Sequence, residues 1–463
     1  MRELRGPDAG FAAKGLPSMH PTSQKRSRVL MISTYSRRML IQRRPSALLW
    51  CLPLFLLTQS VFSYSVLTHE AIIDSAWDGS IKPLLLNRFP QSTPEQLVEA
   101  HAYAYGGSII QDMGYYPFSS KLFTDMVHYV RSGDFIISLI RESTDLNEYA
   151  FSLGALAHYA ADNNGHRLAT NPAVPLLYPK LRQKFGNTVT YADDALSHVK
   201  TEFAFDVLQV AQGHYAPDSY HKFIGFEVAK PLLARAFQGT YGMKLEDVFA
   251  NLSLAIGSYR RSVSSTIPAM TRVAWQLKKD DIIKDVPGLT KKKFMYNLSR
   301  AGYQKQWGKE YTEPGFRSKL LACLIRVLPK VGRLRALRFE TPTPAVEKLF
   351  MASFNATLER YMELLAAQKA GRLKLLNENF DVGAPTPAGK YSLNDRTYAQ
   401  LLHKMKGRYA EMPRELRQDI LAFYKDPSAP NTTKADASEW AKVLTELEAL
   451  KSVALETPPP VAK

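Results

Sequence analysis

Residues 148–161 read EYAFSLGALAHYAA, and apolar side chains occur on almost every face of the helix that this stretch predicts. Such a helix is buried inside a bundle, because a surface helix keeps one polar face. Few segments elsewhere alternate polar and apolar residues with period two, so we expect a mainly α fold. We therefore predict a multi-helix bundle, followed by a helical C-terminal lobe.

Two histidine–carboxylate pairs have a four-residue spacing. They are His158 with Asp162, at the end of the buried run, and His198 with Glu202. On a helix, both side chains of such a pair project from the same face and can hold one cation. A surface ion pair is the alternative for either pair considered alone. The sequence around the pairs contains four further candidates: His69, Asp112, His128 and His166.

The chemistry of this set favours a metal. An ionised carboxylate inside a bundle must be paired, neutralised or bound to a metal, because its burial is otherwise costly. Nitrogen and oxygen ligands without cysteine suit zinc, and they do not exclude manganese or iron. We therefore predict a metal cluster in a cleft of the bundle. His101 is near the candidates in sequence, and we interpret it as a hydrogen-bonded core histidine rather than a ligand.

The order of these residues resembles that of the zinc-dependent phospholipases C of bacteria, which are distantly related to zinc-dependent single-strand nucleases. The similarity covers roughly residues 64–225, and SHVKTEF at 197–203 is similar to the last ligand segment of that family. The resemblance implies three zinc ions per chain. It implies nine metal ligands: Tyr64, His69, Asp112, His128, His158, Asp162, His166, His198 and Glu202.

The resemblance also implies how these ligands are shared and what they do. Asp162 bridges two zinc ions. Tyr64 and His69 are the other ligands of one of these two ions. The other two sites have these remaining ligands: Asp112, His128 and His158 in one, and His166, His198 and Glu202 in the other. Zinc makes water reactive near neutral pH. Asp112 is also the expected catalytic residue, which orients that water or accepts its proton. From a glycerophospholipid the products are diacylglycerol and a phosphorylated head group.

The first of these ligands depends on processing. Residues 47–57 (ALLWCLPLFLL) follow two arginines and form an apolar run that is too short to span a bilayer comfortably. We predict a signal peptide that is cleaved before Tyr64, so that the backbone of the new N-terminus lies five residues before His69. The protein is then exported, either to the periplasm or outside the cell. SRRML at 36–40 resembles a twin-arginine signal, and an uncleaved anchor is the alternative.

Three positions depart from the family pattern. His158 and His166 are only eight residues apart, where better-known members have ten, so we expect a shorter loop between them. Met113 replaces an aromatic residue of the phosphatidylcholine-selective members, and Asp125 replaces a phenylalanine. A choline cage of that kind is therefore absent, although Tyr115, Tyr116 and Asp125 could shape another cation pocket. The head group remains open.

Composition fits an exported globular enzyme. The chain of 463 residues has a net charge of +17, and residues 1–63 contribute ten Lys/Arg against two Asp/Glu, so +9 remains after cleavage. A positive surface favours anionic membranes. Removal of Cys51 leaves Cys323 alone, which excludes an internal disulfide. We predict four regions: an N-terminal extension and signal peptide (1–63), a catalytic domain (64–275), a helical C-terminal region (276–450) and a disordered tail (451–463).

Two other functions stay open at this stage. One is a zinc phosphodiesterase that acts on nucleic acid or another phosphoester, although the chain lacks the motifs that we associate with those nucleases, and nucleic acid is a disfavoured partner. The other is a metal-stabilised helical protein that binds lipid or a cell-envelope partner without catalysis, since closed zinc sites are structural. Residues 319–339 form a basic apolar stretch that either lies in a lipid interface or packs in the core.

Overall fold

The computed structural model describes residues 66–116, 118–212, 226–261, 280, 283–284, 339–426 and 428–456. The chain divides into two units, Met1–Cys51 and Leu52–Lys463, and every described residue belongs to the second. The elements formed by these residues are helices. An isolated antiparallel β-bridge also joins Asn379 and Ala384. The predicted mainly α fold is confirmed.

The bundle that carries the metal-ligand candidates consists of helices joined by short turns. Its elements are α1 (Val66–Ala76), η2 (Trp77–Ile81), α2 (Lys82–Arg88), α3 (Pro94–Ile109), η3 (Ile110–Tyr115), α4 (Lys121–Tyr129), α5 (Ser132–Glu142), α6 (Leu146–Gly165), η4 (His166–Thr170), α7 (Asn171–Leu177), α8 (Pro179–Phe185), α9 (Ala195–Gln212), α11 (Lys230–Tyr241), α12 (Leu245–Val248) and α13 (Leu252–Arg261). The C-terminal elements are α18 (Pro344–Lys369), α19 (Ser392–Lys404), η7 (Tyr409–Glu411), α20 (Arg414–Phe423), η8 (Thr432–Ala435) and α21 (Ala437–Glu456).

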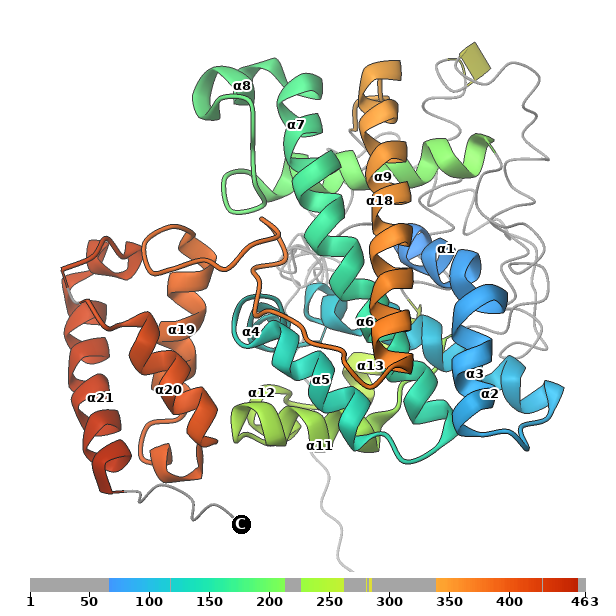
Figure 1. Cartoon of the computed structure of the whole chain (residues 1–463). Coiled ribbons are helices and arrows are strands. Elements are labelled where there is room, and N and C mark those ends of the chain that lie inside the picture. The colour runs from blue at the N-terminus through green and yellow to red at the C-terminus, as the bar shows by residue number, and fades with distance from the viewer. Residues whose placement is uncertain are drawn as a thin grey trace, which may run out of the picture. The chain divides into compact units, whose positions relative to one another are not determined.

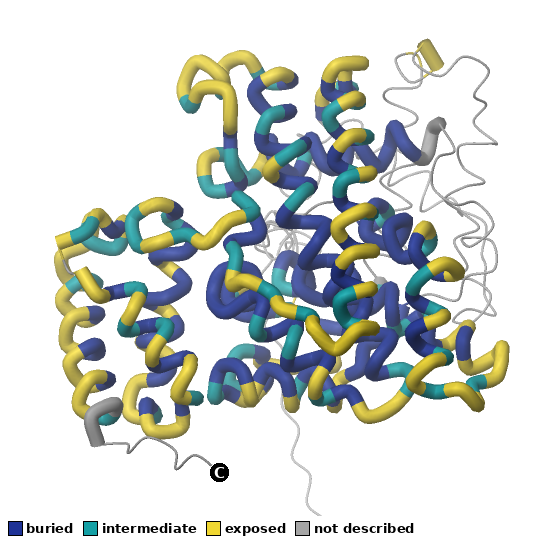
Figure 2. The backbone as a smooth tube through the Cα atoms, in the orientation of Figure 1, coloured by how far each residue is buried: buried dark blue, intermediate teal, exposed yellow. Residues whose placement is uncertain are grey.

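Helix α6 contains the apolar run at 148–161 and is the centre of the bundle. It contacts α3, α5 and α18 along its length (Figure 1). Almost every residue of α6 is buried, as the dark tube in Figure 2 shows. The helix begins where the side chain of Asp145 accepts a hydrogen bond from the Glu148 amide, a standard N-cap. The sequence pattern therefore predicted its burial correctly.

The expected loop between His158 and His166 is wrong, because α6 runs without interruption to Gly165 and continues into η4 and α7. Asn163 and Asn164 stay helical, and η4 is a single π-helical turn of the kind often found at functional sites. Two successive spacings of four residues keep His158, Asp162 and His166 on one side of a continuous helix. The shorter spacing is thus a consequence of helical geometry.

The C-terminal region is helical where it is described. Helix α18 packs along α6, and α19 contacts both α4 and α21. Helix α21 continues to Glu456, six residues past the predicted end of this region at residue 450. No proline or glycine occurs between Ala437 and Glu456 to end the helix earlier. The predicted signal peptide, Tyr64, Cys323 and residues 319–338 are outside the described residues.

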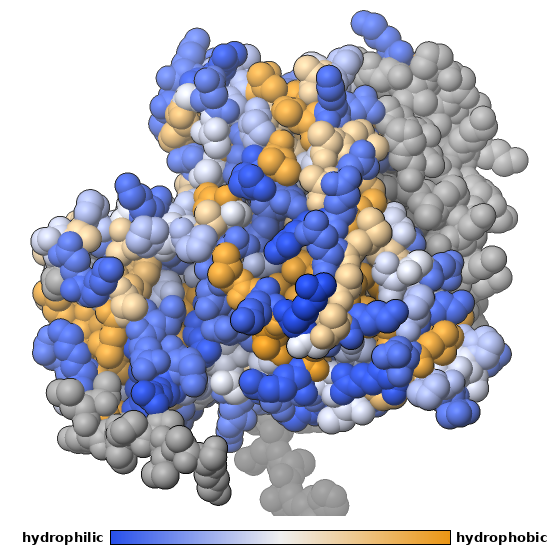
Figure 3. All heavy atoms as spheres, in the orientation of Figure 1, coloured by the Kyte–Doolittle hydropathy of each residue, from blue (hydrophilic) through white to orange (hydrophobic). Residues whose placement is uncertain are grey.

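The described residues bear on the expected membrane contact in two ways. Within the described ranges, no helix combines the length and the apolar character that crossing a bilayer requires. On the face shown in Figure 3, hydrophilic residues predominate and hydrophobic ones gather in small groups between them. The contact with lipid therefore stays a prediction.

Candidate metal centre

Two glycines bring α3 and α6 into close contact beneath the centre. A Cβ atom on Gly107 would lie 1.9 Å from the Phe151 carbonyl oxygen, and one on Gly154 would lie 2.0 Å from the Ala104 carbonyl oxygen. Both distances are far below van der Waals contact, so only glycine allows this approach. The close packing places Asp112, which follows α3 in η3, beside the α6 face that bears the candidate ligands.

Four predicted ligands form one group. Their ligand atoms all lie within 4.8 Å of one another, and all four side chains are buried: Asp112, His128, His158 and Asp162. The Asp162 carboxylate is central, with Oδ2 at 3.4 Å from Nε2 of His128 and 3.1 Å from Nε2 of His158. Nε2 of His128 is also 3.3 Å from Oδ1 of Asp112. Two carboxylates and two imidazoles therefore converge on one point.

Backbone hydrogen bonds set the orientation of both imidazoles. Nδ1–H of His128 donates to the Thr124 carbonyl at 2.9 Å, and Nδ1–H of His158 donates to the Ser108 carbonyl at 2.9 Å. Each Nε2 then faces the carboxylates, and it can bind a metal in its unprotonated form. Within the described residues, these two Nε2 atoms and both oxygens of Asp162 make no hydrogen bond. Buried polar atoms of this kind require a partner, and a divalent cation fits the donor set.

A second group of three predicted ligands lies on η4, which continues α6, and on α9. Glu202 Oε1 is 3.2 Å from Nε2 of His166 and 3.1 Å from Nδ1 of His198, and all three side chains are buried. Nε2–H of His198 donates to Oδ1 of Asn171 at 2.9 Å, which leaves Nδ1 directed at Glu202. The π-turn η4 begins at His166 itself. This group can hold one cation by two nitrogens and one carboxylate.

His69 approaches the first group from α1. Its Nε2 is 3.4 Å from Oδ1 of Asp162 and 3.9 Å from Oδ2 of Asp112, and its ring stacks on His158 with centroids 4.5 Å apart. Asp162 thus directs Oδ1 towards His69 and Oδ2 towards His128 and His158, as a carboxylate that bridges two metals would. Tyr64, the remaining predicted ligand, is outside the described residues.

Helix α1 is held in place by α9. The Asp206 carboxylate accepts hydrogen bonds from the Leu67 amide at 3.2 Å and from the Thr68 hydroxyl at 2.7 Å. Asp206 follows Glu202 by one helical turn, so α9 both supplies a candidate ligand and caps the start of the helix that carries His69.

The electrostatics of the centre suit a cation. Burial raises the pKa of Asp162, but the neighbouring His158 and His166 outweigh it and hold that pKa well below its ordinary value. Asp162 therefore stays ionised. Burial, followed by the charge of His158, lowers the pKa of His69 well below its ordinary value, so His69 stays in the neutral form that binds metals. Burial raises the pKa of Asp112, which makes it the better proton acceptor of the two aspartates.

Sequence reasoning missed Asp381, which belongs to the segment between α18 and α19. Its Oδ1 is 3.3 Å from Nδ1 of His166, on the side of the ring opposite Glu202. The hydroxyls of Tyr129, at 2.8 Å, and Tyr391 also donate to the Asp381 carboxylate. Burial raises the pKa of Asp381, but the bond with His166 outweighs it and lowers the pKa to about 2. No motif spacing could reveal this contact, because 215 residues separate the two partners in sequence.

Residues 68–251 match the family model for zinc dependent phospholipase C. The resemblance stated from the sequence is thereby confirmed over this segment. The match includes every predicted ligand except Tyr64, and it ends well before Asp381. No curated protein and no solved structure gives a significant match to the chain.

A lysine side chain lies beside the residues that we considered for a cationic head-group pocket. Lys121 Nζ forms an ion pair with the Asp125 carboxylate one helical turn away and lies 5.9 Å from the centre of the Tyr115 ring. The ring of Tyr116 packs on Tyr259 with centroids 4.3 Å apart. Because the charge of Asp125 is already balanced, a cation pocket based on this carboxylate is disfavoured.

Two polar groups near the predicted ligands have structural partners. Nε2 of His101 is 3.1 Å from Oδ1 of Asp74, and its ring stacks on Trp77, so the expected hydrogen-bonded histidine is confirmed. The Asp194 side chain accepts a hydrogen bond from the Ser197 amide and caps α9.

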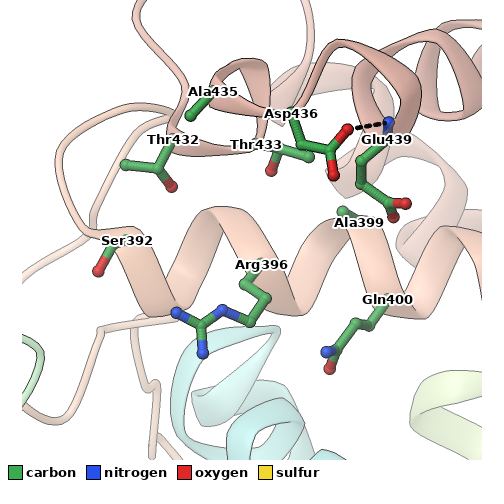
Figure 4. A pocket seen from close by; sticks show the side chains of 9 residues that line it. All are labelled: Ser392, Arg396, Ala399, Gln400, Thr432, Thr433, Ala435, Asp436 and Glu439. Carbon is green, nitrogen blue, oxygen red and sulfur yellow. Dashed lines mark hydrogen bonds between the residues drawn. The ribbon is translucent and has the colours of Figure 1, made fainter.

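A cavity of about 520 Å³ lies in the C-terminal region, between α19, η8 and α21 (Figure 4). Its lining contains Arg396, Asp436 and Glu439 and no histidine. The Asp436 carboxylate accepts a hydrogen bond from the Glu439 amide at 3.1 Å, and this N-cap of α21 accounts for its position. The residues of the metal centre do not contribute to this cavity.

Proposed function

We propose that this protein is a zinc-dependent phospholipase C, which cleaves a glycerophospholipid to diacylglycerol and a phosphorylated head group. The observation that carries the proposal is the two buried groups of candidate ligands, which lie within the segment that matches the family. The continuous helix formed by α6 and η4 contributes ligands to both groups. Sequence similarity supports the reaction class, and the two buried groups of candidate ligands support a metal site within the matched segment.

The described residues would hold the metals in a defined way. Asp162 would bridge, with His69 on one side and Asp112, His128 and His158 on the other, and His166, His198 and Glu202 would hold a separate ion. Bound zinc would activate water near neutral pH and neutralise the charge of the phosphodiester. Asp112 would orient the attacking water and accept its proton, as the resemblance implies.

Three zinc ions per chain and export are part of the same proposal. Helix α1 starts at Val66, two residues after Tyr64, and it carries His69. If processing makes Tyr64 the first residue, its amine and carbonyl would join His69 in completing the bridged site. N-terminal sequencing of the exported protein tests this point, since a different first residue would remove the ligand.

The deciding experiment follows phospholipid hydrolysis. Metal-stripped protein would be incubated with vesicles of phosphatidylcholine, phosphatidylethanolamine or phosphatidylglycerol, before and after zinc is restored, and diacylglycerol and the phosphorylated head group would be measured. His158→Ala removes a central ligand. His403→Ala is a matched control, because His403 is exposed and pairs with Glu446 in the C-terminal region.

The proposal predicts zinc-dependent release of both products, loss of release in His158→Ala and normal release in His403→Ala. Parallel assays with single-stranded DNA and bis(p-nitrophenyl) phosphate distinguish the other functions. Hydrolysis of those substrates without lipid cleavage would replace the phospholipase by another phosphodiesterase. Bound zinc without any hydrolysis would favour a non-catalytic, metal-stabilised protein.

A further inference from the structure

Residues 376–383, here named the strap, join the C-terminal region to the metal centre. In Figure 1 the strap is part of the loop that leads from α18 towards α19. It is fixed to α6 by Glu378, whose carboxylate accepts hydrogen bonds from the Tyr159 hydroxyl at 2.6 Å and from Nδ2 of Asn163 at 3.0 Å. The backbone of Gly383, with a φ of 63°, also lies against Asn163, where a Cβ atom would meet its carbonyl oxygen at 2.3 Å.

The strap contacts His166 through two consecutive residues. Nδ1–H of His166 donates to the Phe380 carbonyl at 3.2 Å and lies 3.3 Å from Oδ1 of Asp381. Both acceptors act on the nitrogen opposite Nε2, which faces Glu202. They therefore fix the tautomer of His166 and the direction of the nitrogen that would bind the metal.

The same strap residue also reaches His198. The Asp381 carbonyl accepts a hydrogen bond from Nδ2 of Asn171 at 2.7 Å, and Oδ1 of Asn171 accepts one from Nε2–H of His198 at 2.9 Å. The side chain of Asp381 thus orients one histidine of the three-residue group, and its main chain orients the other through a single amide.

Two tyrosines hold the Asp381 side chain in place. Tyr129 at the end of α4 and Tyr391 before α19 each donate a hydroxyl hydrogen bond to its carboxylate. The carboxylate is buried and is 3.3 Å from one imidazole nitrogen, an arrangement that raises the basicity of a ligating histidine. A residue that served only to shape the loop would not need to meet the histidine at all.

We propose that Asp381 is a positioning residue for the metal held by His166, His198 and Glu202, so that this metal site is completed by the C-terminal region outside the family-matched segment. The inference rests on the proposed use of zinc. Loss of a hydrogen-bonded carboxylate of this type weakens metal binding by roughly 10- to 100-fold. Only this site should be affected, because among the described residues the Asp381 carboxylate contacts His166, Tyr129 and Tyr391 and forms no ion pair or hydrogen bond with the four-residue group.

The test is a zinc titration of the full chain against a competing chelator. Asp381→Asn keeps the shape of the side chain and removes its charge. Asp419→Asn is the matched control, since Asp419 also lies in the C-terminal region and accepts a hydrogen bond from a tyrosine, Tyr398, at 2.6 Å. We expect about one zinc per Asp381→Asn chain to bind roughly 10- to 100-fold more weakly. Zinc binding in the control should equal that of the original protein.

Three results would overturn the inference: unchanged zinc affinity in Asp381→Asn, an equal loss in Asp419→Asn, or weaker binding at every site. If Asp381→Asn does not fold, Tyr129→Phe is the second test, because it removes one hydroxyl that donates to the Asp381 carboxylate. It should lower the affinity for one zinc ion by a few-fold. Unchanged zinc affinity in Tyr129→Phe would also overturn the inference. Tight zinc binding without phospholipid cleavage would refute the proposed function alone, and cleavage with normal zinc binding in Asp381→Asn would refute the inference alone.

Discussion

Replacing Gly154 by alanine tests whether the metal centre depends on the close approach of α3 and α6. The new Cβ would lie 2.0 Å from the Ala104 carbonyl oxygen and 2.9 Å from the Ser108 amide nitrogen. Ordinary contact begins at 3.4 Å, so the helices must separate by 3.4 minus 2.0, or about 1.4 Å. Gly154 is one turn before His158, whose Nδ1–H donates to the Ser108 carbonyl across the same contact.

The separation should cost both stability and zinc affinity. Overpacking of a core typically costs about 1–3 kcal/mol. A metal site tolerates displacements of only about 0.2 Å in its ligand distances, so a shift of His158 relative to Asp112 should weaken zinc binding by at least about tenfold. Tm of the metal-free protein and zinc affinity by chelator competition are the two measurements.

Gly257→Ala is the control, because Gly257 is in α13 and nothing lies within 4 Å of its added Cβ. Alanine there should leave zinc binding unchanged and stabilise the helix by up to about 1 kcal/mol. If Gly154→Ala matched Gly257→Ala in both Tm and zinc affinity, the argument from helix packing would be refuted.

Three further predictions concern protons, the first helix and metal removal. Burial lowers the pKa of His128, but Asp112 and Asp162 outweigh it and raise the pKa to about 10, so the metal-free protein holds a proton there at pH 7.5 that zinc must displace. Zinc affinity should therefore rise with pH up to about 10, and calorimetry in two buffers of different ionisation enthalpy should show that zinc binding releases protons; no release contradicts this. Asp206→Ala removes the acceptor for Leu67 and Thr68, so amide hydrogens of α1 should exchange faster, and equal exchange would count against the cap. Chelation of the metals should lower Tm by several degrees and added zinc should restore it, since a ligand of the folded state stabilises it; an unchanged Tm would mean that no such ligand is bound.

Helical geometry explains why much of the centre could be predicted from the sequence. A four-residue spacing fixes two side chains on one face, so His158 with Asp162 and His198 with Glu202 needed no knowledge of the fold. The burial of α6 followed from its apolar composition in the same way. The order of the other ligands came from the resemblance, and the structure places His69, Asp112, His128 and His166 beside these pairs.

The parts that could not be predicted depend on contacts between distant segments. Asp381 meets His166 because the strap returns to α6, and no local pattern in the sequence encodes that return. The ion pair between Lys121 and Asp125 has a helical spacing and could have been found, but we interpreted Asp125 through the family comparison alone. The continuous helix through Gly165 was missed because two asparagines and a glycine usually indicate a loop.

The most direct test of the account is diffraction from crystals of the full chain grown with zinc, measured on both sides of the zinc absorption edge. The account predicts anomalous peaks within coordination distance of the four-residue group (Asp112, His128, His158 and Asp162) and of the three-residue group (His166, His198 and Glu202). Absence of zinc at both groups, with their side chains in the positions described, would contradict the central claim that these residues form a zinc centre.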